Sequence, residues 1–206
     1  TVILLHGLGR TRDSMEGMCQ HLRDHADWTA LNVSYASTRE SLDQHAASLG
    51  QVIRNLEGVQ EINFVAHSLG NLVIRRYLTL RSQENAPPQP RLGRIVMLAP
   101  PNQGAQLAER FRRIGLFEAV MGASGTDLAN HWDVLEQQLA VPGCEFGIIA
   151  GGTGRDEGRN PLLDGDDDLV VSVAETRLAG ARDFAVIPSL HTIIMDHPLV
   201  REYTLR

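Results

Sequence analysis

The chain has 206 residues, of which 43% are hydrophobic and 21% charged, an ordinary balance for a single globular domain. A net charge of −6, with no basic run, argues against a nucleic-acid partner. No 18 consecutive residues are apolar, so we expect no transmembrane segment in this chain. The sequence starts without Met inside an apolar run, which predicts that its true N-terminus is missing and leaves the compartment open between cytoplasm and secretion.

The first predicted element is a strand over residues 1–5, a short, fully apolar and β-branched run typical of a strand buried on both faces. It leads into His6-Gly7-Leu8-Gly9. This segment is either a simple strand-to-helix connection or an oxyanion loop, in which the backbone N–H of Leu8 points at a site above the sheet.

Residues 10–58 predict a helix, a strand and a second helix. Asp13 or Ser14 caps the first helix, residues 29–35 form the strand, and a capping box of Ser37 and Glu40 opens the second helix. The apolar faces of the two helices are Met15, Met18, Cys19 and Leu22 in the first, and Leu42, Ala46, Leu49, Ile53 and Leu56 in the second. Cys19 and Cys144, the only cysteines, are expected as free thiols, with a disulfide as the less favoured alternative.

Residues 61–73 carry the motif on which the functional interpretation depends. An apolar run breaks at Ala66-His67-Ser68-Leu69-Gly70 and resumes with helical spacing. This is the nucleophile-elbow pattern G-x-S-x-G with alanine in the first position, and it would hold Ser68 in a strained, exposed turn. The alternative is that Ser68 only caps the helix that follows, because serine is a favoured N-cap.

Further apolar runs predict strands at residues 94–99, 145–150 and 185–188. Strands that alternate with helices indicate an α/β fold with a mainly parallel sheet and helices on both faces. Such folds keep their ligand sites at the carboxyl edge of the sheet, where Pro100-Pro101-Asn102-Gln103-Gly104 is expected to lie.

Residues 105–143 are the least regular part of the chain. They predict either ordinary connecting helices or a small cap over the site, lined by Phe117, Met121 and Trp132, that would receive an apolar acyl chain. The chain is therefore expected to be one domain, residues 1–206, with a minimal cap.

An acidic segment follows, Leu163-Asp164-Gly165-Asp166-Asp167-Asp168-Leu169-Val170-Val171. A calcium loop would use Asp164, Asp166, Asp168 and Glu175, but its sixth position needs glycine and holds Leu169. We therefore predict no metal site, and interpret one aspartate as the acid that orients a catalytic histidine.

His191 directly follows the last predicted strand, where the general base of such a site should lie. It completes the chain order Ser68, Asp168, His191. That order, rather than any single residue, favours a catalytic interpretation.

With these motifs the chain resembles the α/β-hydrolase superfamily over essentially its whole length, and small bacterial serine esterases and lipases of the Bacillus type in particular. His6-Gly7-Leu8-Gly9 resembles the oxyanion loop of bacterial lipases, and residues 66–70 resemble the alanine-variant elbow. Residues 165–173 resemble the family's G-D-N-D-G-T-V-x-V loop, with Leu169 in place of the usual glycine. The match makes Asp168 the acid, and a shift of one residue would make it Asp167.

The resemblance implies a carboxylic ester hydrolase that acts on acyl or lipid esters through Ser68, Asp168 and His191. The backbone N–H groups of Leu8 and Leu69 would form the oxyanion hole, and neither a metal nor an organic cofactor would be needed. Two alternatives stay open: acyl transfer or amide hydrolysis by the same three residues, and a hydrolase-like protein that only binds a ligand.

Overall fold

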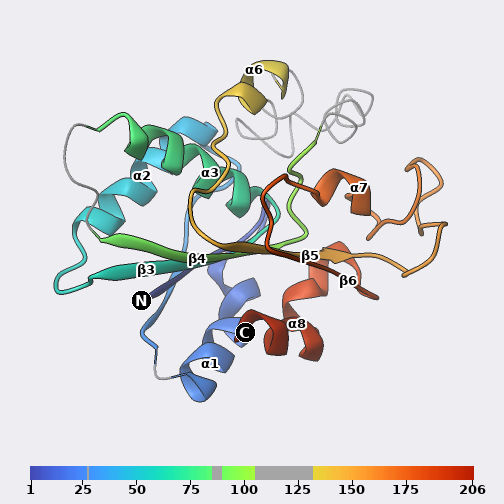
Figure 1. Ribbon diagram of the computed structural model, residues 1–206, viewed down its shortest axis with the longest axis horizontal. Helices are drawn as coiled ribbons and strands as arrows, with labels where there is room; N and C mark the ends of the chain where they lie inside the picture. Colours follow the sequence, from blue (N-terminus) through green and yellow to red (C-terminus); the bar gives the residue numbers. More distant parts are fainter. Residues whose placement is uncertain (27, 85–89, 105–131) are drawn as a thin grey trace.

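The computed structural model describes residues 1–26, 28–84, 90–104 and 132–206. Its centre is a six-stranded, all-parallel sheet in the order β2-β1-β3-β4-β5-β6 (Figure 1). The strands are β1 (Val2–Leu5), β2 (Ala30–Val33), β3 (Glu61–His67), β4 (Arg91–Leu98), β5 (Phe146–Gly151) and β6 (Asp183–Ile187). The predicted parallel α/β architecture is confirmed.

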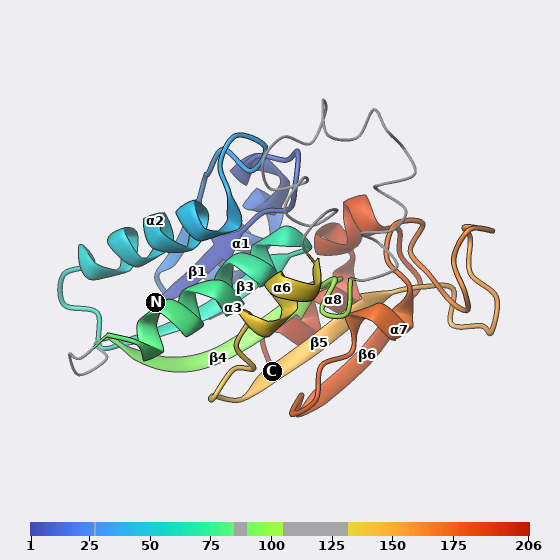
Figure 2. The ribbon, with the colours of Figure 1, turned by 90° about the horizontal axis from the view of Figure 1, so that it is seen from above.

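Helices cover both faces of this sheet, as expected. On one face lie α2 (Leu42–Arg54), α3 (Leu69–Ser82) and α6 (Trp132–Gln137), and on the other α1 (Glu16–His25) and α8 (Pro198–Thr204) (Figures 1 and 2). Shorter turns complete the described chain: η1 (Arg12–Met15), α7 (Val173–Thr176) and η2 (His191–Asp196). Within the described residues, no helix is both long enough and apolar enough to cross a lipid bilayer.

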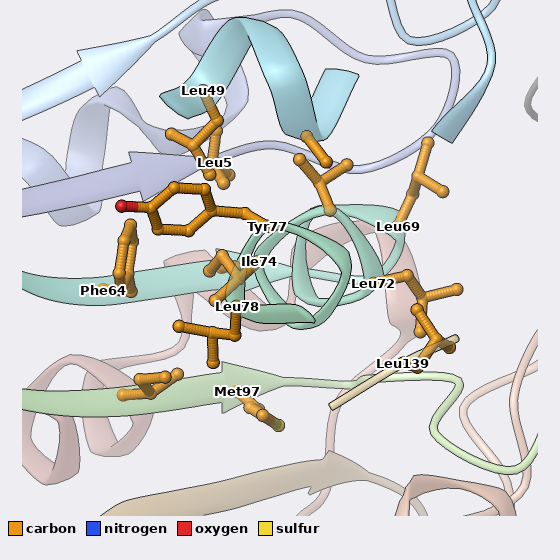
Figure 3. Packing of buried hydrophobic residues seen from close by; sticks show 14 of the residues in the cluster. Leu5, Leu49, Phe64, Leu69, Leu72, Ile74, Tyr77, Leu78, Met97 and Leu139 are labelled. Atoms are coloured by element: carbon orange, nitrogen blue, oxygen red, sulfur yellow. The ribbon is translucent and has the colours of Figure 1, made fainter. Parts of the chain in front are cut away.

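The sheet separates two hydrophobic cores, and the alternation of side chains along β1 explains why its whole sequence is apolar. Ile3 and Leu5 pack in one core against α2 and α3, whereas Val2 and Leu4 pack in the other against α1. Figure 3 shows the first core, where Tyr77 of α3 lies between Leu5, Leu49 and Phe64. Burial of each such leucine or phenylalanine contributes about 1.5–3 kcal/mol.

Three sequence predictions need correction. Neither Asp13 nor Ser14 caps the first helix, because the N-cap position of α1 is Met15 and no side chain caps it. The capping box that opens α2 is formed by Ser41 and Gln44, not by Ser37 and Glu40. The Ser37 hydroxyl is instead buried and accepts a hydrogen bond from the Gly9 amide (3.1 Å). β4 also begins at Arg91, before the start of the strand predicted over residues 94–99. The faces predicted for α1 and most of α2 are buried, and Cys19 and Cys144 are free thiols.

Parallel strands place their carboxyl ends at one edge of the sheet, and this is where the predicted motifs meet. Leu5 at the end of β1 lies opposite Ala66 of β3, and Leu98 at the end of β4 lies opposite His67. The loops that follow β1, β3, β5 and β6 therefore leave the sheet at the same edge.

Candidate active site

Ser68 sits at a sharp strand-to-helix turn between β3 and α3. Its backbone has φ 50° and ψ −120°, a left-handed conformation that costs a non-glycine residue about 1–3 kcal/mol. Ser68 occupies the N-cap position of α3, yet its side chain makes no capping hydrogen bond. The alternative that Ser68 only caps the helix is therefore wrong. Ser68 occupies the N-cap position, but its hydroxyl makes its hydrogen bond to a residue outside the helix.

Two glycines let the turn close against β1. A Cβ added at Gly70 would lie 2.9 Å from the carbonyl oxygens of both Leu5 and His6. A Cβ added at Gly7 would lie 2.7 Å from His67 Nδ1 and 3.1 Å from Ser68 Cβ. The loop after β1 is thus in close contact with the elbow, which the prediction of an oxyanion loop requires.

The partner of the Ser68 hydroxyl is His191, which begins the η2 turn just beyond β6. Ser68 Oγ lies 3.0 Å from His191 Nε2, although the two residues are 123 positions apart in the sequence. Ser68 and His191 are 8% and 7% exposed, so both are nearly withdrawn from solvent but still reachable from it.

Asp168, not Asp167, contacts the histidine. Asp168 Oδ2 lies 2.7 Å from His191 Nδ1, and its other oxygen accepts hydrogen bonds from the amides of Val170 and Val171. The Asp167 carboxylate is fully buried as well, but it accepts from the amides of Asn160 and Leu169. Because a carboxylate cannot donate, His191 Nδ1 carries the proton and Nε2 is left to accept from the serine hydroxyl.

Backbone contacts hold the acid and histidine loops together. The His191 amide donates to the Asp168 carbonyl (2.9 Å), and the Arg159 guanidinium reaches the carbonyls of Gly152 (2.6 Å) and Ser189 (3.4 Å). Arg159 therefore joins the end of β5 to the segment before His191. Nothing in its local sequence predicted this contact.

The calcium alternative finds no support in the described residues, where no group of three or more His, Cys, Asp or Glu side chains could hold a metal ion. Three of the four carboxylates of that alternative have other partners, and Asp168 is the one that contacts His191. Asp166 accepts from the amides of Thr153 and Gly154, and Glu175 forms a capping box with Ser172.

The assignment of the Leu8 and Leu69 amides to an oxyanion hole stays a prediction, and the surroundings of the two residues can be described. Leu69 is the first residue of α3, so its amide belongs to the N–H groups that have no partner inside a helix. The positive end of the α3 dipole faces the same point. The loop that carries Leu8 is fixed at Gly9 by Ser37, and Arg10 donates to the Thr192 carbonyl (3.3 Å) next to His191.

His67 is a buried neighbour of the site that the sequence analysis did not single out. Its Nε2 lies 2.9 Å from the His191 carbonyl oxygen, so this nitrogen donates, and the two rings are 4.8 Å apart. Burial and the nearby His191 hold the pKa of His67 well below its ordinary value, so the ring is neutral. It supports the main chain of His191 and adds no charge.

A buried arginine gives the Pro100–Gly104 segment a structural role. Arg75 of α3 is 3% exposed and donates to the Asn102 side chain (3.1 Å) and to the carbonyls of Leu139 and Ala140. Asn102 in turn donates to the Thr176 carbonyl (2.9 Å). Desolvation lowers the pKa of Arg75 to about 10, which still leaves it charged at neutral pH.

Of the three residues predicted to line an acyl pocket, Phe117 and Met121 lie outside the described residues. Trp132 is 5% exposed and belongs to the hydrophobic core, where its ring lies beside Gly104. The cap expected over residues 105–143 stays a prediction, since residues 105–131 are outside the described part of the chain.

Comparison with solved structures identifies the fold. The mature lipase BlEst2 of Bacillus licheniformis has a TM-score of 0.77 at 16% identity, with 99% of this chain and 89% of that chain covered. A thermophilic esterase from Thermogutta terrifontis has a TM-score of 0.63 at 14% identity, covering 99% and 87%. The RedJ thioesterase of Streptomyces coelicolor has a TM-score of 0.60 at 13% identity, also covering 99% and 87%. These likenesses show the α/β-hydrolase fold.

Sequence comparison adds the family. No curated protein matches the chain. A family described as a domain of unknown function, DUF7379, matches residues 1–139, a segment that includes the loop after β1 and the elbow but ends before Asp168 and His191. The chain belongs to the DUF7379 family and has the α/β-hydrolase fold.

Proposed function

We propose that this protein is a serine hydrolase that cleaves carboxylic esters through Ser68, His191 and Asp168. The observation that carries the proposal is the chain of two hydrogen bonds from Ser68 Oγ through His191 to Asp168, 3.0 and 2.7 Å long. Its geometry suits a nucleophile, a general base and a group that orients the base.

In the proposed reaction His191 Nε2 removes the Ser68 proton as Oγ attacks the ester carbonyl carbon. The tetrahedral intermediate collapses when His191 returns the proton to the leaving alkoxide, and an acyl-enzyme and an alcohol result. Water then attacks the acyl carbon with His191 again as the base. The bond from this carbon to Ser68 Oγ breaks as His191 returns the proton to Oγ, and the acid product leaves. Asp168 holds the imidazole in the required tautomer and stabilises the imidazolium that forms.

The oxyanion of the intermediate would accept hydrogen bonds from the amides of Leu8 and Leu69. The position of Leu69 at the start of a 14-residue helix supports this assignment, because the free N–H groups and the dipole favour negative charge there. Both donors are backbone groups, so substitution of either leucine side chain would not remove them.

The test is hydrolysis of p-nitrophenyl esters of increasing acyl length by the wild type and by Ser68→Ala. We expect the wild type to turn over at least one ester and the mutant to lose about 10⁴-fold or more in kcat. The mutant's folding is checked by circular dichroism. Equal rates for the two proteins would overturn the proposal.

The same panel tests the alternatives. If the wild type leaves every ester intact but hydrolyses an amide, the protein is an amidase. If it instead transfers an acyl group to an added alcohol, it is an acyltransferase. If all substrates stay unchanged while a ligand binds, the protein is a binding member of this fold.

A further inference from the structure

We propose that His6 is a positioning residue that aims the Leu8 amide at the oxyanion, through a hydrogen bond to the carbonyl of Gly7. This inference rests on the proposed function, because it concerns one of that function's two oxyanion donors. It gives a chemical role to a buried histidine that makes no contact with the Ser68 hydroxyl in the described structure.

The first step is the contact itself. His6 is fully buried, and its Nδ1 lies 2.9 Å from the Gly7 carbonyl oxygen. A carbonyl oxygen can only accept, so His6 Nδ1 carries a proton and donates it. The Arg10 amide donates more weakly to the same oxygen, at 3.3 Å.

The second step is the planarity of the peptide. The Gly7 carbonyl and the Leu8 N–H belong to one peptide unit, and in a trans peptide they point in opposite directions within one plane. A donor that fixes the direction of the Gly7 C=O therefore fixes the direction of the Leu8 N–H. His6 acts on the amide without touching it.

Tyr35 locks the histidine in the tautomer that this requires. The Tyr35 amide donates to His6 Nε2 (3.3 Å), so that nitrogen must lack a proton. The Tyr35 hydroxyl donates to the His6 carbonyl (2.6 Å), and the two rings stack 4.3 Å apart. Burial lowers the pKa of His6, which keeps the ring neutral and preserves the Nδ1–H form.

Packing makes the position of this peptide matter. Gly7 has no room for a side chain because His67 and Ser68 lie against it. A rotation of the Gly7–Leu8 peptide would therefore change the donor geometry next to the nucleophile, where angles below about 120° weaken a hydrogen bond steeply.

The test compares an oxygen ester with the matching thionoester, whose C=S sulfur is a weak hydrogen-bond acceptor and gains little from an oxyanion donor. For His6→Phe we expect kcat on the oxygen ester to fall about 10- to 100-fold, with KM nearly unchanged. The rate on the thionoester should fall much less, so the oxygen-to-sulfur rate ratio drops.

A conservative variant and a control sharpen the result. His6→Asn keeps an N–H donor near the Nδ1 position and should restore most of the rate ratio. His25→Asn, at an exposed histidine of α1, should change neither rate.

If His6→Phe does not fold, Tyr35→Phe replaces it. Loss of the hydrogen bond from the Tyr35 hydroxyl to the His6 carbonyl should lower the rate ratio by a smaller factor. An equal loss on both esters would overturn the proposal, because it would place the defect in the triad or the fold.

An NMR measurement separates this proposal from the proposed function. The ¹⁵N shifts of the His6 ring should show the neutral Nδ1–H tautomer at pH 7 in both the wild type and Ser68→Ala. A proton on Nε2, or an imidazolium, would refute the positioning role even in an active enzyme. If the protein hydrolyses no ester and the tautomer is as expected, the proposed function fails while the orientation of the Gly7–Leu8 peptide stands.

Discussion

The elbow at Ser68 and the acid loop at Asp168 both contain a non-glycine residue with a positive φ, but they hold it in different ways. Ser68, with φ 50°, is enclosed by packing, since Ala66 and Leu69 are buried, Gly7 lies against Ser68, and Gly70 lies against the end of β1. Leu169, with φ 83°, is 43% exposed. Its loop is held by carboxylates that accept hydrogen bonds from its own backbone amides.

The difference teaches which substitutions each region can accept. The elbow can form only because Gly7 and Gly70 have no side chains, so a methyl group added at either glycine should disturb it. The conformation of the acid loop depends on the carboxylates of Asp167 and Asp168, which accept hydrogen bonds from its amides. Its other side chains can therefore be substituted as long as these two carboxylates remain. The resemblance to lipases fits this picture, because the residue that they usually have at position 169 is glycine, which adopts a positive φ without strain.

The largest expected effect separates the two neighbouring aspartates of the acid loop. Asp168→Asn should lower kcat about 10⁴-fold, because the amide favours the wrong tautomer of His191. Asp167→Asn should lower kcat by less than about tenfold and the free energy of unfolding by about 1–3 kcal/mol, since it weakens the acceptors for the partly buried amides of Asn160 and Leu169. Steady-state kinetics and urea unfolding of both variants check this, and reversed kinetic effects would make Asp167 the acid.

A methyl group at the elbow should have the next largest effect. Gly70→Ala places a Cβ 2.9 Å from two backbone carbonyl oxygens, which cannot move aside as a flexible side chain could. We expect a loss of about 1–3 kcal/mol in the free energy of unfolding, together with reduced activity. Gly143→Ala is the matched control, because its Cβ would meet no atom within 4 Å. Similar unfolding midpoints for the two variants would contradict the packing argument.

Relief of backbone strain in the acid loop should raise the free energy of unfolding, by a smaller amount than the preceding changes lower it. Leu169→Gly removes a left-handed leucine whose cost is about 1–2 kcal/mol, although glycine returns part of this through the entropy of the unfolded chain. We expect a net stabilisation of about 1 kcal/mol by thermal or urea unfolding, with kcat unchanged. If the variant is less stable than the wild type, the Leu169 side chain must contribute more packing energy than its 43% exposure indicates.

The smallest expected effect is a dependence of stability on pH at Asp166. Burial alone would raise the pKa of this carboxyl, but hydrogen bonds from Thr153 and from the Gly154 amide outweigh it and hold the pKa below 3.8. A lowered pKa in the folded state gives stability that is complete above the ordinary value and is lost as pH falls through the lowered one. Asp166→Asn should therefore be less stable than the wild type at pH 7, with the gap closing in acid. A gap that stays constant from pH 7 to pH 2 would exclude this linkage.

The sequence predicted those parts of the molecule that depend on local patterns. Apolar runs marked all six strands of the sheet, and the order of Ser68, Asp168 and His191 identified the three residues that the fold brings together. The capping box was misplaced because Ser37–Glu40 and Ser41–Gln44 fit the same pattern. Only the contact of Ser37 with the Gly9 loop distinguishes them, and that contact spans 28 residues.

The supporting contacts could not be predicted for the same reason. His6 meets Tyr35 across 29 residues, and Arg75 meets Asn102 across 27. Each depends on the register of the sheet rather than on a spacing in one segment. Among these supporting residues only His67 had a local signal in the sequence, which is its place next to Ser68.

The position of β6 at one end of the sheet order bears on when the proposed activity could first appear. Translation yields Ser68 long before His191, and His191 is held through Ile194 and Met195, which are fully buried in the core against α1. A growing chain with a folded elbow thus has a serine but no base to activate it. The proposed chemistry can therefore begin only after β6 and η2 have docked, and a nascent chain that ends before them should hydrolyse no ester.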